Sequence, residues 1–209
     1  MISLNNYIIE KLNINKSKLK NGPECTLFPE TMGELADMIK KEIEQNGNKC
    51  SLNHIDTNKI TDMSFLFSKG TKFGLSNFNG DMSNWDVSNV TDMSHMFAHS
   101  DFNGNISDWD VSNVKDMEAM FEYSKFNSDL SNWDISKVKD MSHMFEHSEF
   151  NNDSICNWDV SNVGNMISMF HTSPFNHDIS NWQVNPKCTV SDIFMGCAIN
   201  IEFEPKCLQ

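Results

Sequence analysis

The side chains with the widest chemical range in this chain are its histidines and a set of regularly spaced aspartates. Either residue type can ligate a metal ion or move a proton when several side chains converge. The aspartates follow the same short motif at nearly constant intervals, so they form one column of a repeating structure: Asp56, Asp86, Asp110, Asp134 and Asp159. Such a column can bind cations, or each carboxylate can accept backbone N–H groups from its own turn.

The turn interpretation of the aspartate column is favoured. Carboxylates about 5 Å apart would repel by roughly 3 kcal/mol at an effective dielectric constant of 20. A D-V-S-N segment places backbone N–H groups within reach of the carboxylate, and it has no loop that wraps a calcium ion. We therefore expect a structural column, with no metal ion and no cofactor.

The histidines fall into columns whose members lie two repeats apart. His95 and His143 share one column, and His99 and His147 share another. Two repeats correspond to roughly 10 Å, which is too far for one metal ion with ligand bonds of about 2 Å. We therefore expect separate, exposed histidines.

Catalytic motifs are missing from the sequence. It contains no G-x-S-x-G segment, no cysteine–histidine nucleophile arrangement and no phosphate-cradling glycine loop. We therefore expect no catalytic residues and a protein that is not an enzyme.

The elements that must position these residues are copies of one unit, marked by tryptophan. Trp85, Trp109, Trp133, Trp158 and Trp182 follow one another at intervals of 24, 24, 25 and 24 residues. A fixed period of this length indicates stacked repeats that bury their apolar faces against neighbours. Each tryptophan stands where an inward leucine belongs, which favours a core ladder over an exposed stripe that stacks sugars or bases. A neighbouring Asn or Asp side chain is the expected acceptor of its indole N–H.

The apolar spacing within one unit predicts a strand and then a short helix. Ile106, Trp109 and Val111 have the L-x-x-L-x-L spacing of a leucine-rich-repeat strand, and V-x-x-M-x-x-M-F is typical of one to two helical turns. The predicted fold class is an α/β solenoid: right-handed, leucine-rich-repeat-like coils of about 24 residues with a parallel strand ladder and short helices. The aligned strands are Leu52–Thr57, Met82–Val87, Leu130–Ile135, Ile155–Val160 and Ile179–Val184.

The two ends of the chain are expected to close the repeats. Thr31 and Glu34 form a capping box, and the apolar spacing after them predicts an amphipathic helix over 31–46 that covers the first coil. Alternating apolar residues near the C-terminus predict a last strand. The expected parts are an N-terminal cap at 1–49, a repeat solenoid at 50–198 and a C-terminal cap strand at 199–209.

Charge and cysteine usage bear on partners and location. The net charge of −13 argues against direct nucleic-acid binding, because phosphate contacts need basic residues. An acidic body can instead bind a basic partner or imitate nucleic acid. The cysteines have no zinc spacing, and neither a secretion signal nor a membrane span is evident, so we expect a cytoplasmic protein of a bacterium or of a phage-infected cell.

The repeat resembles that of the BspA-like leucine-rich-repeat proteins, in their mycoplasma branch of unknown function. The signature F-N-x-D-[IL]-S-x-W-D-V-S-x-V-x-D-M-x-x-M-F occurs at 102–121 and 126–145 with one departure in each, Asn105 and Ile135, and the resemblance covers residues 50–198. The resemblance implies protein binding and no catalytic residues. Many relatives are surface proteins, which implies surface adhesion as an alternative role.

Positions that differ between repeats are the candidates for partner contact, because residues that recur are explained by the coil itself. The same small polar residue types recur on the predicted strand face from repeat to repeat. The residue types that differ between repeats lie on the predicted helical edge and in the insertion after the first repeat. We therefore expect a non-enzymatic protein-interaction module, or alternatively an acidic phage or mobile-element antagonist of a nucleic-acid-handling host protein. The expected partner-binding residues are Phe65, Lys69, Lys72, Phe73, His95, His99, Tyr123, His143 and His147.

Overall fold

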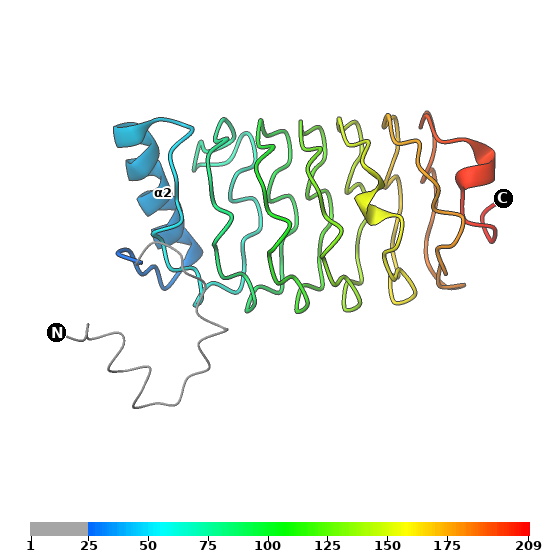
Figure 1. Cartoon of the computed structure of the whole chain (residues 1–209), viewed down its shortest axis with the longest axis horizontal. Coiled ribbons are helices and arrows are strands. Elements are labelled where there is room, and N and C mark those ends of the chain that lie inside the picture. The colour runs from blue at the N-terminus through cyan, green and yellow to red at the C-terminus, as the bar shows by residue number, and fades with distance from the viewer. Residues whose placement is uncertain (1–24) are drawn as a thin grey trace, which may run out of the picture.

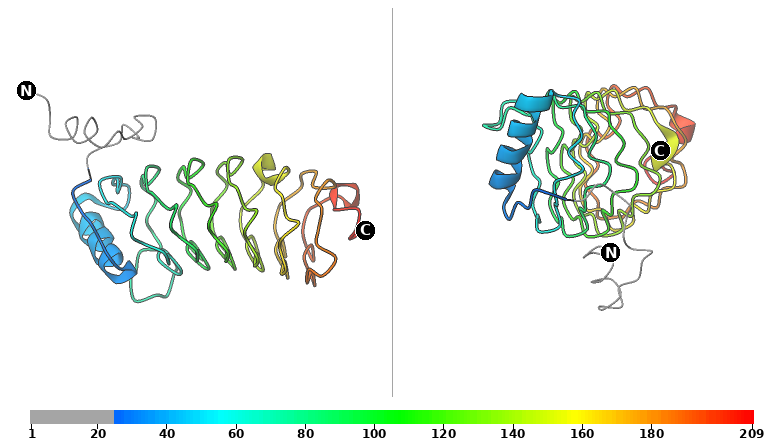
Figure 2. Two further views of the ribbon diagram at one scale, coloured as in Figure 1. Left: turned by 90° about the horizontal axis from the view of Figure 1, so that it is seen from below. Right: turned by 60° about the vertical axis from the view of Figure 1, so that its left-hand side comes forward.

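A computed structural model describes residues 25–209, so the first part of the expected N-terminal cap, residues 1–24, lies outside the described residues. Figure 1 shows a row of similar coils of chain lying side by side, with a helix at the N-terminal end. The turns of successive coils line up along the row in the views of Figure 2. Three helical elements are present in this range: α2 at Met32–Asn46, and the 3-10 helices η2 at Asp153–Ile155 and η3 at Ile201–Phe203.

Helix α2 is defined by its own end residues. The side chain of Thr31 accepts the N–H of Glu34, and the carboxylate of Glu34 accepts the N–H of Glu30, the residue before the N-cap, so two side-chain bonds close the N-terminus. Gly47 ends the helix with a φ of 82°, a value that favours glycine. Leu35 and Ile39 are fully buried and join the main core. The helix lies against the first coil and covers its apolar end (Figure 1).

The prediction of an α/β solenoid is wrong, because residues 25–209 contain no strand and no sheet. Their β pairing consists of isolated parallel bridges, most of them in one column. The expected strands are interrupted by turns: the N–H of Trp85 donates to the carbonyl of Met82, and that of Val90 to Val87, three residues earlier in each case. In a strand ladder these N–H groups would face a neighbouring coil. We call the column that holds most of the bridges the bridged column. It contains one residue from each of coils one to six, at the start of a run of turns: Asp62, Asp92, Asp116, Asp140, Asn165 and Thr189.

The predicted short helices are also replaced by turns within the described repeats. His95 and His99 have φ values of 53° and 55°, which interrupt a right-handed helix. N–H groups of alternate residues donate to carbonyls of the next coil and not to the residue four positions back. The donors in the second coil are Met93, His95, Phe97 and His99. Backbone hydrogen bonds therefore run along the row and hold neighbouring coils in register.

The aspartate column forms turns of the predicted kind. One carboxylate oxygen of Asp110 accepts the N–H of Ser112 at 3.1 Å and its hydroxyl at 2.6 Å. The hydroxyl and the N–H of Ser136 hold the pKa of Asp134 below its usual value. Each carboxylate therefore has donors of its own, which offset the repulsion between like charges along the column. The other members bonded to the N–H two residues on are Asp56, Asp86, Asp134 and Asp159.

The five tryptophans lie in the core, with exposed fractions of 1 to 6 %. The indole N–H of Trp109 donates to the backbone carbonyl of Met82 in the preceding coil at 3.2 Å, so the expected Asn or Asp side-chain acceptor is wrong. A backbone carbonyl serves because the acceptor must lie inside the apolar core, where these polar side chains do not reach. The ring of Trp109 stacks on Trp85 at 6.2 Å. The remaining indole bonds run from Trp85, Trp133, Trp158 and Trp182 to the carbonyls of Leu52, Ile106, Leu130 and Ile155.

The predicted C-terminal strand at 199–209 is wrong. Its centre is the 3-10 helix η3, and Ile201 is 73 % exposed although it stands at an inward position of the predicted alternation. The N–H of Phe203 donates to the carbonyl of Asn200 within this turn, and the carbonyl of Phe203 accepts the N–H of Ile179 from the last repeat. The turn thus closes the row through single hydrogen bonds and not through strand pairing. No helix in residues 25–209 is long and apolar enough to cross a membrane.

The bridged column supplies a prediction about charge. Burial raises the pKa of Asp116, and the charges of Asp92 and Asp140 raise it further. Asn165, at the same place two coils on, donates its amide to Asp140 at 2.9 Å while its oxygen accepts a backbone N–H. Asp116→Asn should therefore raise the free energy of unfolding at pH 7 by about 0.5–1 kcal/mol, a gain limited by solvent screening.

Urea unfolding of the Asp116→Asn variant at two pH values checks this expectation. A raised pKa means that the ionised Asp116 costs stability, and this cost disappears as the pH falls through the folded-state pKa. The difference between variant and parent should thus shrink in acid. A variant less stable than the parent at pH 7 would show that Asp116 makes a favourable charged interaction.

Candidate functional site

The side of the row that we call the turn edge consists of residues with left-handed backbone conformation. Two such residues recur in each of coils two to five, four positions apart, with φ between 50° and 58°, and Phe65 is the single member in the first coil. This conformation costs non-glycine residues about 1–2 kcal/mol, and here the inter-coil backbone bonds hold it in place. The first set of the turn edge is Phe65, His95, Ala119, His143 and Ser168, and the second is His99, Tyr123, His147 and Thr172.

Aromatic rings stack on one another along the turn edge. Tyr123 lies between His99 and His147, with ring centroids 4.6 and 4.4 Å away. At the N-terminal end of the row, Phe65 stacks on His95 at 4.4 Å. Tyr123 is 48 % exposed and Phe65 is 43 % exposed. The ring faces therefore support each other while part of each ring remains open to solvent.

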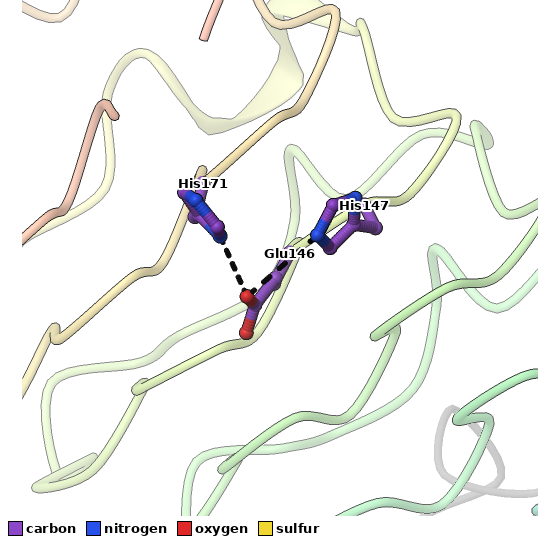
Figure 3. A group of neighbouring side chains, drawn as sticks. All are labelled: Glu146, His147 and His171. Atoms are coloured by element: carbon purple, nitrogen blue, oxygen red, sulfur yellow. Dashed lines mark hydrogen bonds and ion pairs between the residues drawn. The ribbon is translucent and has the colours of Figure 1, made fainter. Parts of the chain in front are cut away.

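One carboxylate brings three of the histidines together. The two oxygens of Glu146 contact His143 Nδ1 at 2.5 Å and His171 Nδ1 at 2.7 Å, and His147 Nε2 lies 4.0 Å from the oxygen shared with His171. Figure 3 shows His147 and His171 on either side of the Glu146 carboxylate. Burial raises the pKa of Glu146, but the hydrogen bonds from His171 and His143 outweigh this effect and lower it. This group is the Glu146 cluster.

The expectation of separate histidines is wrong for His143 and His147. His95 and His99 do lie two coils away from His143 and His147. The contacts of His143 and His147 are instead with Glu146 of the same coil, which also binds His171 of the next coil. The sequence carries a signal, because Glu146 and His171 occupy the same position after the Met-Phe pair in adjacent repeats, next to His147. A comparison of neighbouring columns in adjacent coils would have found the cluster.

The insertion after the first coil contributes less to the turn edge than expected. Lys69 is exposed there, and its N–H continues the inter-coil ladder to Ala98. Phe73, however, is partly buried against the core, and Lys72 Nζ lies 5.2 Å from the centre of its ring. These two residues line a shallow hollow against α2, together with Gly33, Ala36, Asp37 and Lys40. The structure therefore separates Lys72 and Phe73 from the stacked rings.

Comparison with known proteins gives one match. A family model described as a mycoplasma protein of unknown function, DUF285, matches residues 34–153 and, in a second overlapping match, residues 122–203. No curated protein and no solved structure matches the chain. What the chain does must therefore be argued from its own surface.

Proposed function

The chain belongs to the DUF285 family, whose description assigns no function, and we propose from the turn edge that the protein is a non-enzymatic interaction module for a protein partner. The observation that carries this proposal is a row of partly exposed rings over four coils, in two stacks: Phe65 on His95, and His99 with Tyr123 and His147. Tyr123 stands at its centre, between His99 and His147. We also propose that the chain is a member of the BspA-like group, on the basis of the shared repeat signature.

The chemistry of the turn edge suits a protein interface. Aromatic residues are enriched among the side chains that carry most of the binding energy. Stacking on both faces of the Tyr123 ring orders it before any partner arrives, which reduces the entropy lost on binding. The inter-coil backbone bonds give the same order to the main chain beneath it.

The surface formed by the D-V-S turns is a weaker candidate for partner contact than the turn edge. The D-V-S turns present carboxylates that are already hydrogen-bonded to their own serines, as Asp110 is to Ser112. That surface offers neither an aromatic ring nor an arginine as an anchor. The turn edge is therefore the better candidate for partner contact.

A paired substitution tests the proposal. Phe65→Ala combined with Tyr123→Ala should weaken binding roughly thirtyfold, the equivalent of about 2 kcal/mol for truncated interface aromatics. Phe73 is not part of the pair, because its partial burial against the core would confuse binding with folding. The matched control is Ser112→Ala with Ser136→Ala on the D-V-S turns, which should leave the affinity nearly unchanged.

The experiment begins with affinity capture from cells of the source, with quantitative mass spectrometry of the wild type and both double variants. A protein captured by the wild type and by the serine variant, but lost with the aromatic variant, is then purified and its affinity measured. Circular dichroism confirms that each variant is folded. Loss of binding in the serine variant alone would place the partner on the D-V-S turns. Displacement of the partner by DNA or RNA would instead support an acidic antagonist.

A further inference from the structure

The Glu146 cluster has the composition and spacing of a metal site. Glu146, His147 and His171 each offer one ligand atom, and these atoms all lie within 4.8 Å of one another. Metal bonds of about 2.0–2.2 Å in tetrahedral geometry separate neighbouring ligand atoms by about 3.3 Å. The Glu146 oxygen lies 2.7 Å from one imidazole nitrogen and 4.0 Å from the other, on either side of that value. Closing the longest separation, which is at most 4.8 Å, to this value needs side-chain movements of about 1–1.5 Å in total, and these would bring the three atoms onto one ion.

The surroundings hold these side chains in place. The N–H of His147 donates to the carbonyl of His171 at 2.9 Å, so the inter-coil ladder ties the two histidines at the main chain. Tyr123 stacks on the His147 ring, and His143 holds the second oxygen of Glu146. Contacts of this kind orient ligands in metal sites. The side chains of Glu146, His147 and His171 are 15, 30 and 23 % exposed, so an ion can enter from solvent and water can complete its coordination.

The donor set selects the class of ion. Two imidazole nitrogens and one carboxylate oxygen suit zinc and neighbouring transition metals, whereas calcium and magnesium require oxygen ligands. We propose that Glu146, His147 and His171 bind one divalent first-row transition metal ion, with zinc as the reference case, and so connect the fourth and fifth coils. This inference does not depend on the proposed partner, since the chain alone can be tested.

His99 provides a matched control within the chain. It occupies the same set of the turn edge as His147 and also stacks on Tyr123, but Ala98 stands where Glu146 stands in the fourth coil. His99→Gln therefore removes an equivalent histidine without touching the cluster. Cys156 and Cys197 compete weakly at neutral pH, because burial raises the pKa of the Cys156 thiol to about 11 and also raises that of Cys197.

Calorimetric titration of the full chain with zinc chloride tests the site, with calcium and magnesium chloride as comparison salts. We expect one zinc ion per chain and no calcium or magnesium binding. His171→Gln and Glu146→Gln should each weaken zinc binding at least tenfold, and His99→Gln should leave it unchanged. The melting temperature of the wild type should rise with zinc concentration, as it does for any ligand that binds the folded state.

Two further measurements keep the result decisive. Circular dichroism without metal must show that the variants are folded, and His147→Gln replaces any variant that is not. Cobalt in place of zinc should give visible absorption without the strong near-ultraviolet bands of thiolate ligands. The proposal is overturned if the wild type binds no zinc at millimolar concentration, or if His171→Gln and Glu146→Gln bind zinc as tightly as the wild type does.

Discussion

Trp109→Ala is expected to lower the free energy of unfolding by about 3–5 kcal/mol, the usual cost of truncating a large buried side chain. Trp109 is 2 % exposed, and its ring lies 6.2 Å from that of Trp85 and 6.4 Å from that of Phe97. The substitution leaves a cavity between two coils that the backbone bonds on either side prevent from closing. The indole hydrogen bond to Met82 is lost as well.

Two control variants separate the contributions to the effect of Trp109→Ala. Trp109→Phe retains most of the ring and should cost about 1–2 kcal/mol, since Met82 keeps the N–H of Trp85 as a donor. Tyr123→Ala removes a half-exposed ring from the turn edge and should cost much less than Trp109→Ala. Urea unfolding followed by circular dichroism gives all three values. Equal stability of the Trp109→Ala variant and the parent protein would mean that the tryptophan ladder is not part of the core.

Gly80→Ala is expected to cost about 3 kcal/mol, at the upper end of the usual range for overpacking. A methyl group at Gly80 would overlap the backbone carbonyl oxygen of Cys50 and lie 2.8 Å from the ring of Phe78. The Cys50 carbonyl accepts the N–H of Asp81 at 3.1 Å, so it can move away only by breaking that bond. Phe78 is buried and cannot turn aside.

Gly164→Ala is the matched control for this clash. Its added methyl group would lie 3.6 Å from the nearest atom, the carbonyl oxygen of Lys139, which is an ordinary contact. Thermal unfolding should therefore show a clear fall in melting temperature for Gly80→Ala and little change for Gly164→Ala. Equal melting temperatures for the two variants would contradict the close approach between the first coils.

The turn edge and the Glu146 cluster illustrate what a single column can and cannot predict. The positions that vary between repeats include the three residues whose rings stack, His99, Tyr123 and His147. A comparison of histidines within one column does not predict the Glu146 cluster, because the histidines of the cluster occupy different columns. His171 lies beside Glu146 because it occupies the same position after the Met-Phe pair in the next repeat.

Features that depend on residues a few positions apart can be predicted from the sequence alone. The capping box at Thr31, the turn closed by Asp110 on Ser112 and the burial of Trp109 each follow from local spacing and from which side chains are apolar. The repeat interval likewise follows from the tryptophans. These features require no knowledge of the neighbouring coil.

The course of the backbone between the buried side chains depends on how the coils pack. An inward spacing such as that of Ile106, Trp109 and Val111 states which residues face the core, and both a strand and a chain of turns can satisfy it. The choice depends on where backbone N–H groups find acceptors. Here the acceptors are carbonyls three residues back and carbonyls of the next coil, with left-handed residues such as His95 between them. The carbonyls of the next coil become available as acceptors only once the coils are stacked.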